Sequence, residues 1–296
     1  MKKLFYGLFF ALLLCSLTVS GLAEVTVHLN ETPPADWQER DLLRLIVFKT
    51  TPTDAMLLEC GGESMMVDGG TRKFARVLET ALKELGYGDT EDGHVHMPLV
   101  FNTHPHDDHL QGVWQMVRNG MTVGLFMTSF PSDYRNDMQQ QALREFAAHQ
   151  IPARFLQQNE EMTLGGASLR FFWWADGHDP NELSCFLRIG YGNTSILLTG
   201  DAVGLSQRGV LDQVPAEWLQ ADVLKAPHHA YTIMVKEFLD AVNPKFVFAT
   251  NTLYYAQTTA DQVERRGIQF TTNTGGRLVL ETDGNEWYIT QLKGVI

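Results

Sequence analysis

A histidine-rich segment directly after an apolar run restricts the possible folds of this chain more than any other feature. The letters PLVF (residues 98–101) lead into NTHPHDDH (residues 102–109). Imidazole nitrogens and carboxylate oxygens suit a borderline cation such as zinc. A histidine-rich run on a surface is typically repetitive and solvated, whereas this one follows a segment with the pattern of a buried strand. The segment therefore predicts a metal site at the end of a β-strand.

The spacing inside this segment predicts two groups of ligands. His104 and His106 can bind one ion, while Asp108 and His109 lie on the opposite side of the turn and can bind another. Two neighbouring divalent ions are a common arrangement in hydrolytic enzymes.

Two later segments end in the same kinds of side chain. TSILLTGDA (residues 194–202) is an apolar run that ends in Gly200 and Asp201, and LKAPHHA (residues 224–230) places His228 and His229 after another apolar run. Each segment alone is a weak signal, because aspartate and histidine are also common as caps or in satisfied core positions. Together with the first segment, they predict ligands that converge from separate strand ends on a rigid metal site.

Strand and helix patterns alternate through the rest of the chain. Apolar runs bounded by turn residues predict strands at 42–50, 55–62, 64–70, 98–103, 153–158, 167–175, 183–192, 194–201, 245–251, 277–284 and 286–290. Helical spacing of apolar residues predicts helices at 71–86, 133–150, 216–220, 232–242 and 259–267. Residues 25–41 read as a short lead-in, and Gly192 with Asn193 as a hairpin turn. Because no Pro-, Gly- or Ser-rich linker divides these elements, we predict one α/β domain over residues 24–296, with two face-to-face sheets covered by helices.

Several of these segments resemble the metallo-β-lactamase-fold superfamily. THPHDDHLQG (residues 103–112) looks like its metal-binding signature, and VDGG (residues 67–70) resembles its first motif. The segments 181–201, 222–230 and 269–284 are most similar to the ComEC-type branch, named after the C-terminal domain of competence proteins. The resemblance covers the chain from about Leu42 to its C-terminus. It implies an αββα four-layer sandwich with two divalent ions, most often zinc and alternatively manganese, between the sheet edges.

The resemblance also implies roles for individual residues. His104 and His106 would hold the first metal, Asp108, His109 and His229 the second, and Asp201 would bridge the two. Asp68 would support the histidine loop without binding metal. His228 would remain free at the mouth, where it can contact the oxyanion of a substrate or protonate its leaving group. The assignment between His228 and His229 follows from position alone and is left open.

The chain departs from the family pattern in two places. Most members carry a third histidine for the first metal, whereas this chain reads GHDPNELS at residues 177–184. Asn181 aligns near that position, and a loop shift would bring His178 there instead. ComEC-type proteins also often carry Tyr-Gly-His-Pro where this chain has Tyr255 to Thr258, YAQT.

The resemblance implies hydrolysis by a hydroxide that the two metals share, with Asp108, His228 and Asp201 as the catalytic residues. We expect a phosphodiester as the substrate, because the ComEC-type branch includes phosphodiesterases. The alternatives are a β-lactamase or another lactam or thioester hydrolase, and, in a different class, a metal-stabilised binding module without turnover. Trp173, Trp174, Tyr254 and Tyr255 could form a cage for a quaternary ammonium group, although packing in the core or at the rim is the more frequent role of such residues.

The N-terminus and the net charge indicate where the protein acts. Residues 1–23 have the order of a secretory signal peptide, with Lys2 and Lys3 before an apolar run and small residues at the end. An uncleaved membrane anchor is the alternative. Cleavage would leave a secreted, extracytoplasmic chain without a membrane segment. The formal net charge of −12 opposes binding to a phosphate backbone, so we expect a small phosphoester rather than stable binding to nucleic acid. After cleavage Cys60 and Cys185 remain, and we expect both to be buried thiols.

Overall fold

Strand β2 (Leu43–Val47) shows how the sequence pattern produces two packed layers. Successive side chains of a strand point to opposite faces of the sheet. In β2, Leu45 and Val47 lie in a core shared by two sheets, whereas Ile46 packs against helices on the other face. The computed structural model describes residues 25–88 and 93–296, and this alternation recurs in the strands of both sheets.

The described residues form two sheets. The first is a nine-stranded sheet in the order β1-β16-β15-β2-β3-β4-β5-β6-β7, and the second is a seven-stranded sheet in the order β14-β13-β12-β11-β10-β9-β8. The strands of the first sheet are β1 (Thr26–Leu29), β2 (Leu43–Val47), β3 (Ala55–Cys60), β4 (Glu63–Gly69), β5 (His96–Asn102), β6 (Thr122–Thr128), β7 (Ala153–Phe155), β15 (Gly276–Thr282) and β16 (Glu286–Lys293). Those of the second are β8 (Glu160–Leu164), β9 (Ala167–Phe172), β10 (Phe186–Tyr191), β11 (Thr194–Leu198), β12 (Val223–Lys225), β13 (Phe246–Ala249) and β14 (Gln269–Thr272).

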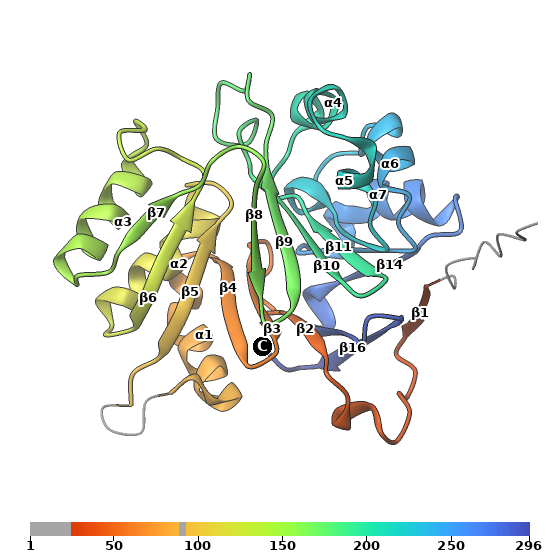
Figure 1. The fold of residues 1–296 in the computed structure, drawn as a ribbon, viewed down its shortest axis with the longest axis horizontal. Helices are drawn as coiled ribbons and strands as arrows, with labels where there is room; N and C mark the ends of the chain where they lie inside the picture. Colours follow the sequence, from red (N-terminus) through yellow and green to blue (C-terminus); the bar gives the residue numbers. More distant parts are fainter. Residues whose placement is uncertain (1–24, 89–92) are drawn as a thin grey trace, which may run out of the picture.

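Helices cover the outer face of each sheet, as Figure 1 shows on its left and right sides. The helices are α1 (Ala75–Leu82), α2 (Asp107–Arg118), α3 (Asp137–Ala148), α4 (Gly204–Gln213), α5 (Ala216–Leu219), α6 (Lys236–Val242) and α7 (Leu253–Glu264). Buried apolar residues of α1 to α3 form one core with the first sheet, and those of α4 to α7 form another with the second sheet. The third and largest core lies between the sheets.

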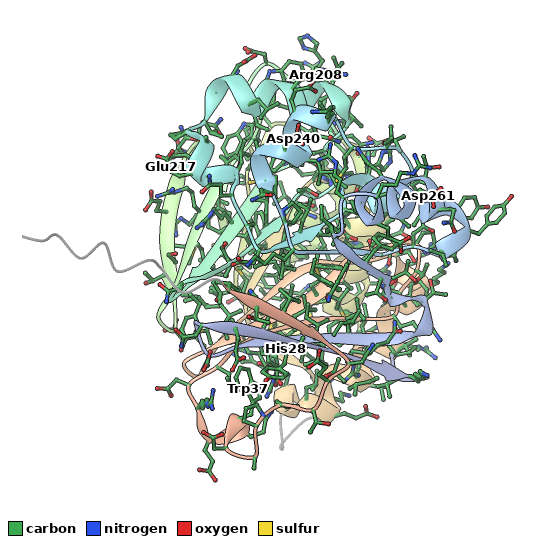
Figure 2. The ribbon with its side chains drawn as sticks, turned by 90° about the vertical axis from the view of Figure 1, so that its right-hand side faces the viewer. His28, Trp37, Arg208, Glu217, Asp240 and Asp261 are labelled. Atoms are coloured by element: carbon green, nitrogen blue, oxygen red, sulfur yellow. The ribbon has the colours of Figure 1, made fainter. Side chains whose placement is uncertain are left out.

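Figure 2 shows the same arrangement from the side. Arg208, Glu217, Asp240 and Asp261 mark the helices over the second sheet, and His28 marks the β1 edge of the first. The layers therefore run helix, sheet, sheet, helix, which confirms the predicted αββα sandwich.

The largest difference from the sequence prediction concerns the histidine-rich segment. We expected a turn there, but α2 begins at Asp107, so Asp108 and His109 lie in the first helical turn. Leu110, Val113 and Val117 have helical spacing and are buried against the first sheet. That spacing was a helix signal that the adjacent metal-ligand pattern obscured.

Several other elements also differ from the prediction. Residues 25–30 contain a strand, β1, which pairs with β16 at the far end of the chain and therefore has no local partner in the sequence. Helix α3 begins at Asp137 and not at 133, because the Asn136 side chain accepts a hydrogen bond from the backbone N–H of Gln139 and caps the helix. Helix α7 covers Leu253–Glu264 rather than 259–267, and α4 was not predicted.

Other expectations are met or lie outside the described residues. Cys60 and Cys185 are buried free thiols, as expected. The predicted signal peptide, residues 1–23, lies outside the described residues. Among the residues that are described, none of the helices has both the length and the apolar character needed to cross a bilayer.

Candidate metal centre

The predicted ligands come from both sheets and meet at one edge of the sandwich. His104 and His106 follow β5, and Asp108 and His109 begin α2 in the layer of the first sheet. From the second sheet, Asp201 follows β11, and His228 and His229 lie in a short turn, Pro227–Ala230, after β12. The strands thus deliver their polar ends to a common place, as the sequence predicted.

One group of atoms has the spacing of ligands around a small cation. His109 Nε2 lies 3.2 Å from Asp201 Oδ1 and 3.3 Å from His229 Nε2. His229 Nε2 lies 3.3 Å from Asp201 Oδ2 and 3.4 Å from Asp108 Oδ2. A tetrahedral zinc ion with bonds of about 2.0–2.1 Å holds its ligand atoms about 3.3 Å apart. The donor set of this second position therefore fits a divalent ion.

The atoms of the first position are also close together. His104 Nε2 lies 3.1 Å from His106 Nδ1, and 3.9 Å from Asp201 Oδ2. Asp201 is thus near both positions, and its buried Oδ1 atom, although 3.2 Å from His109 Nε2, makes no well-aligned hydrogen bond among the described residues. A buried carboxylate oxygen in that state is unfavourable unless a cation compensates it.

The outward-facing nitrogen of His109 is held by the predicted supporting residue. Asp68 Oδ2 accepts hydrogen bonds from His109 Nδ1 at 2.8 Å and from the Thr103 hydroxyl at 2.7 Å. Asp68 Oδ1 accepts from the backbone N–H of Thr103 and the amide of Asn102. Because Nδ1 of His109 is the hydrogen-bonding nitrogen, Nε2 is directed toward Asp201. Asp68 is fully buried and lies beside the cluster, as expected for a residue that orients a ligand.

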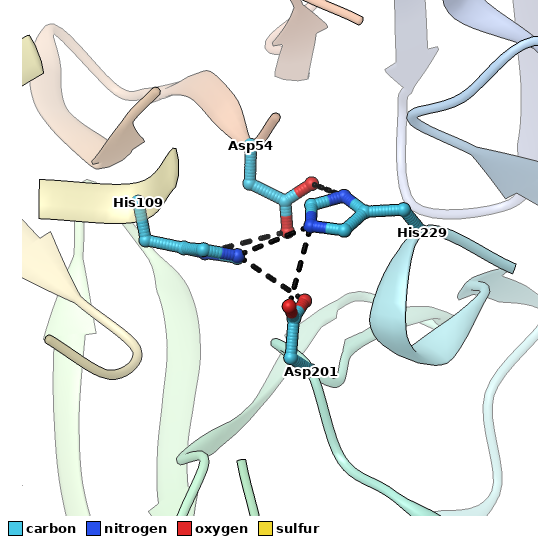
Figure 3. A group of neighbouring side chains, drawn as sticks. All are labelled: Asp54, His109, Asp201 and His229. Atoms are coloured by element: carbon cyan, nitrogen blue, oxygen red, sulfur yellow. Dashed lines mark hydrogen bonds and ion pairs between the residues drawn. The ribbon is translucent and has the colours of Figure 1, made fainter. Parts of the chain in front are cut away.

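Sequence reasoning missed two further buried groups at this site, Asp54 and Lys225. Asp54 precedes β3, and its Oδ2 forms an ion pair with Lys225 Nζ at 2.6 Å. Figure 3 shows Asp54 and Asp201 on opposite sides of the His109 and His229 rings. One ligand atom from each of these four residues lies within 4.8 Å of the others. Lys225 ends the otherwise apolar strand VLK, which was a sequence signal for a buried acidic partner. Asp54 stands in an ordinary polar turn before β3, which carries no such signal.

Buried charge shifts the pKa of these groups strongly. Burial lowers the pKa of His109, but the carboxylates of Asp201 and Asp68 outweigh it and raise that pKa to about 10. Burial also lowers the pKa of His229, but the carboxylates of Asp201 and Asp54 outweigh it and raise that pKa well above its ordinary value. Burial and the charge of His109 together keep the pKa of His104 well below its ordinary value. Without metal, His109 and His229 therefore supply the positive charge that balances the buried carboxylates.

His228 differs from its neighbour. Its side chain is 30% exposed, and its Nε2 lies 3.8 Å from Asp201 Oδ2. Burial lowers the pKa of His228, so its ring is neutral at pH 7. His228, His229 and Ala230 all have positive φ angles, a costly backbone conformation that the surrounding structure must enforce. The turn directs His229 into the cluster and leaves His228 at its mouth.

Asn181 and His178, the two predicted candidates for the third ligand of the first metal, are not joined to this cluster by hydrogen bonds or ion pairs in the described chain. Asn181 Oδ1 is buried without a partner, whereas His178 is exposed and its backbone N–H binds Glu182. The metal role of Asn181 stays a prediction.

A cavity of about 600 Å³ opens beside the ligands. His106 and Asp108 line one part of it, and Arg135, in the loop before α3, lines another. Eight described residues line this cavity, and Arg135 is the only arginine or lysine among them. Besides His106, Asp108 and Arg135, the lining residues are Pro105, Asp107, Asn136, Asp137 and Met138. A larger cavity of about 800 Å³, between β1, α6 and β14, contains none of the predicted ligands.

The four aromatic residues of the hypothetical cage do not meet. Tyr254 and Tyr255 are exposed on α7 and contact each other, with ring centroids 5.1 Å apart. Trp173 packs against the core between the sheets, and Trp174 against the helices of the second sheet. No ring contact joins a tryptophan to these tyrosines within the described residues, so the cage hypothesis as stated is wrong. Tyr231 instead connects Tyr255 to the mouth of the site, through centroid distances of 5.7 Å to Tyr255 and to His228.

Comparisons with known proteins support the fold. A sequence profile of the metallo-beta-lactamase superfamily matches residues 49–249. No curated protein sequence matches the chain. Among solved structures, the metallo-beta-lactamase fold protein YhfI from Bacillus subtilis has a TM-score of 0.51 and 13% identity, over 82% of this chain and 100% of that one. Zn(2+)-bound PqqB from Methylobacterium extorquens has a TM-score of 0.52 and 12% identity, over 80% of this chain and 99% of that one. CmlA, a diiron beta-hydroxylase from Streptomyces venezuelae, has a TM-score of 0.53 and 13% identity, over 86% of this chain and 55% of that one.

Proposed function

The chain belongs to the metallo-beta-lactamase superfamily, and we propose that it is a secreted hydrolase that uses two divalent metal ions, most plausibly zinc, to cleave phosphodiester bonds in a small substrate. The superfamily consists largely of metal-dependent hydrolases. The observation that carries the proposal is the convergence on His229 Nε2, which lies 3.3 Å from His109 Nε2, 3.3 Å from Asp201 Oδ2 and 3.4 Å from Asp108 Oδ2. We assign the second ion to these four residues and the first to His104, His106 and Asp201, with Asn181 as a further candidate ligand.

The hydrogen-bond partners of the two rings also support metal binding. Asp68 accepts the Nδ1 hydrogen of His109, and Thr250 lies 2.9 Å from the Nδ1 of His229. If both rings are neutral, their Nε2 lone pairs face each other at 3.3 Å. Two lone pairs at that distance repel unless a proton or a cation lies between them, so the rings are arranged for an ion.

Bound divalent ions would supply an acidified water as the nucleophile and would neutralise charge on the phosphoryl oxygens. The chain itself would orient the substrate. Arg135 lines the cavity that His106 and Asp108 also line, where its guanidinium can bind an anionic oxygen of the substrate. Neutral His228 at the mouth can donate a hydrogen bond to the departing oxygen.

Three properties support a small phosphodiester over other substrates. Arg135 favours an anion over a neutral amide or thioester. The formal net charge of −12 disfavours long nucleic acids. The sequence segments that resemble the ComEC-type branch point to the same chemistry. The signal-like residues 1–23 support secretion, with the mature enzyme acting outside the cytoplasm.

The test is to measure the metal content of the purified mature chain and then its hydrolysis of bis-p-nitrophenyl phosphate with added Zn²⁺ or Mn²⁺. We expect about two ions per chain and an activity that Asp201→Ala abolishes. Asp212→Ala, on α4 and outside the cluster, is the matched control and should retain the activity. Turnover of nitrocefin without phosphodiester hydrolysis would show a lactamase instead. Two bound ions without turnover of any ester, lactam or thioester would show a metal-stabilised binding module.

A further inference from the structure

Asp54 and Thr250 form a chain of contacts that ends at the proposed ligand His229. Thr250 follows β13, and its hydroxyl donates a hydrogen bond of 2.5 Å to Asp54 Oδ1. The same hydroxyl oxygen lies 2.9 Å from His229 Nδ1. Asp54, Thr250 and His229 are all fully buried, so water does not compete for these contacts.

The number of available protons decides the state of His229. A threonine hydroxyl has one proton to donate. Because that of Thr250 goes to Asp54, its oxygen can only accept a hydrogen bond from His229. Nδ1 of His229 must therefore carry a hydrogen, and Nε2, which faces Asp108 and Asp201, is the nitrogen left to bind a metal.

A matching chain of contacts serves the first metal position. The Thr103 hydroxyl donates to Asp68 Oδ2 at 2.7 Å and lies 3.2 Å from His104 Nδ1. By the same count, His104 carries its hydrogen on Nδ1 and directs Nε2 toward His106. Each proposed metal position thus has an aspartate–threonine–histidine relay, and Asp68 of the first relay also accepts a hydrogen bond from His109 of the second position.

Lys225 fixes the second relay and connects it to Asp201. Its ammonium group lies 2.6 Å from Asp54 Oδ2 and donates a 2.8 Å hydrogen bond to the carbonyl oxygen of Gly200, the residue before Asp201. Asp54 Oδ2 is thus held by the Lys225 ammonium group, and Asp54 Oδ1 accepts the Thr250 hydrogen bond. Asp54 is therefore a carboxylate whose two oxygens are already engaged.

We propose that Asp54, Thr250 and Lys225 are positioning residues dedicated to the second metal, and that Asp54 is not itself a ligand. Asp54 lies close enough to His109, Asp201 and His229 to be grouped with them as a metal site. However, its oxygens face the Nδ1 atoms, 3.3 Å from that of His229 and 3.8 Å from that of His109, while the Nε2 atoms point to Asp201. The inference rests on the proposed function, because it assumes that the cluster binds two divalent ions.

The test separates the two metal positions by removing one ligand. His104→Ala removes a ligand of the first metal and keeps the second position intact. His229→Ala removes a ligand of the second metal and keeps the first position intact. Zn²⁺ affinity is measured in each background by competition with a chromophoric chelator. Thr250→Val, which keeps the volume but removes the hydroxyl, should weaken Zn²⁺ binding about 10–100-fold in the His104→Ala background. It should leave the His229→Ala background unchanged, whereas Thr103→Val should weaken binding there.

Thr250→Ser keeps the hydroxyl and should restore the affinity, which a simple packing defect would not predict. Thermal unfolding of each metal-free variant confirms that it folds. Unchanged affinity of Thr250→Val in the His104→Ala background, or equal losses in both backgrounds, would overturn the inference. A wild-type chain that binds two ions but cleaves no phosphodiester would contradict the proposed substrate only. A wild-type chain that binds no divalent ion would contradict both.

Discussion

Gly112 on α2 offers the sharpest test of how the fold positions the ligands. A Cβ atom at this residue would lie 1.8 Å from the carbonyl oxygen of Gly69 and 2.9 Å from that of Gly70, at the end of β4. The backbone N–H of Gly112 already donates a 2.7 Å hydrogen bond to Gly70. Because the obstacles are backbone atoms, no side-chain rotation relieves the contact, and Gly112→Ala must push α2 away from β4.

The size of the shift follows from these distances. Real Cβ atoms essentially never approach heavy atoms closer than 3.0 Å. Starting from 1.8 Å, the helix must therefore move by roughly 1.2 Å if it retreats along the line of contact. Asp108 and His109 lie in the first turn of this helix and would move with it. Metal–ligand distances tolerate only about ±0.2 Å, so the second metal position should lose its geometry.

We expect Gly112→Ala to lower phosphodiester turnover about 100-fold, the usual cost of a misplacement of about 1 Å. Overpacking costs about 1–3 kcal/mol of stability, and the better helix propensity of alanine returns about 1 kcal/mol. The variant should therefore remain folded while binding one Zn²⁺ ion more weakly.

The assays are chelator competition for Zn²⁺ and denaturation by urea. Gly204→Ala is the matched control, because a Cβ there meets only the end of the Arg208 side chain at 3.4 Å and Val235 at 3.7 Å. A Gly112→Ala variant that binds both ions with wild-type affinity would refute the argument that this close contact sets the position of the ligands.

Four other expectations follow from the site. His228→Ala should lower kcat about 100-fold on an alkyl phosphodiester but less than about tenfold on a p-nitrophenyl ester, whose leaving group needs no hydrogen bond; equal losses on both would contradict the role of His228. Arg135→Ala should raise KM for bis-p-nitrophenyl phosphate about tenfold with kcat little changed, and a KM that stays constant would remove Arg135 from substrate binding. Lys225→Met removes the ammonium partner of the buried Asp54 carboxylate and should cost about 3–5 kcal/mol in urea denaturation of the metal-free protein, part of which Asp54→Asn in the same chain should restore. The raised pKa of His109, about 10, means that its protonated ring stabilises the metal-free fold fully below pH 6.5, and this contribution is lost as the pH rises toward 10. Urea midpoints that do not fall over that range in the presence of EDTA would argue against it.

The sequence predicts the parts of the site that are local and leaves out those that depend on folding. His104, His106, Asp108 and His109 lie within six residues of each other, so their chemistry is visible without a structure. Asp54 carries no such signal, because it stands in the ordinary polar turn TPTD. Its partners Lys225 and Thr250 are 171 and 196 residues away, and only the packing of the two sheets brings them together.

The fold shows the same division. The alternation of apolar residues in strands such as β2 predicts the sheets, because each face of a strand packs against a different layer. Strand β1 could not be predicted in this way, since its partner β16 lies at the opposite end of the sequence. Helix α7 was predicted six residues late, because its exposed first turn, with Tyr254 and Tyr255, gives no apolar face.

His109 and His229 are 120 residues apart in the sequence and lie in the layers of different sheets. An ion held between them can therefore be bound by the folded chain but not by the unfolded one. Unfolding would release it, so free metal in the surroundings shifts the folding equilibrium by mass action. At a concentration 100 times the dissociation constant, one such ion adds about 2.7 kcal/mol to the free energy of unfolding. The lifetime of this protein would then follow the local supply of divalent metal.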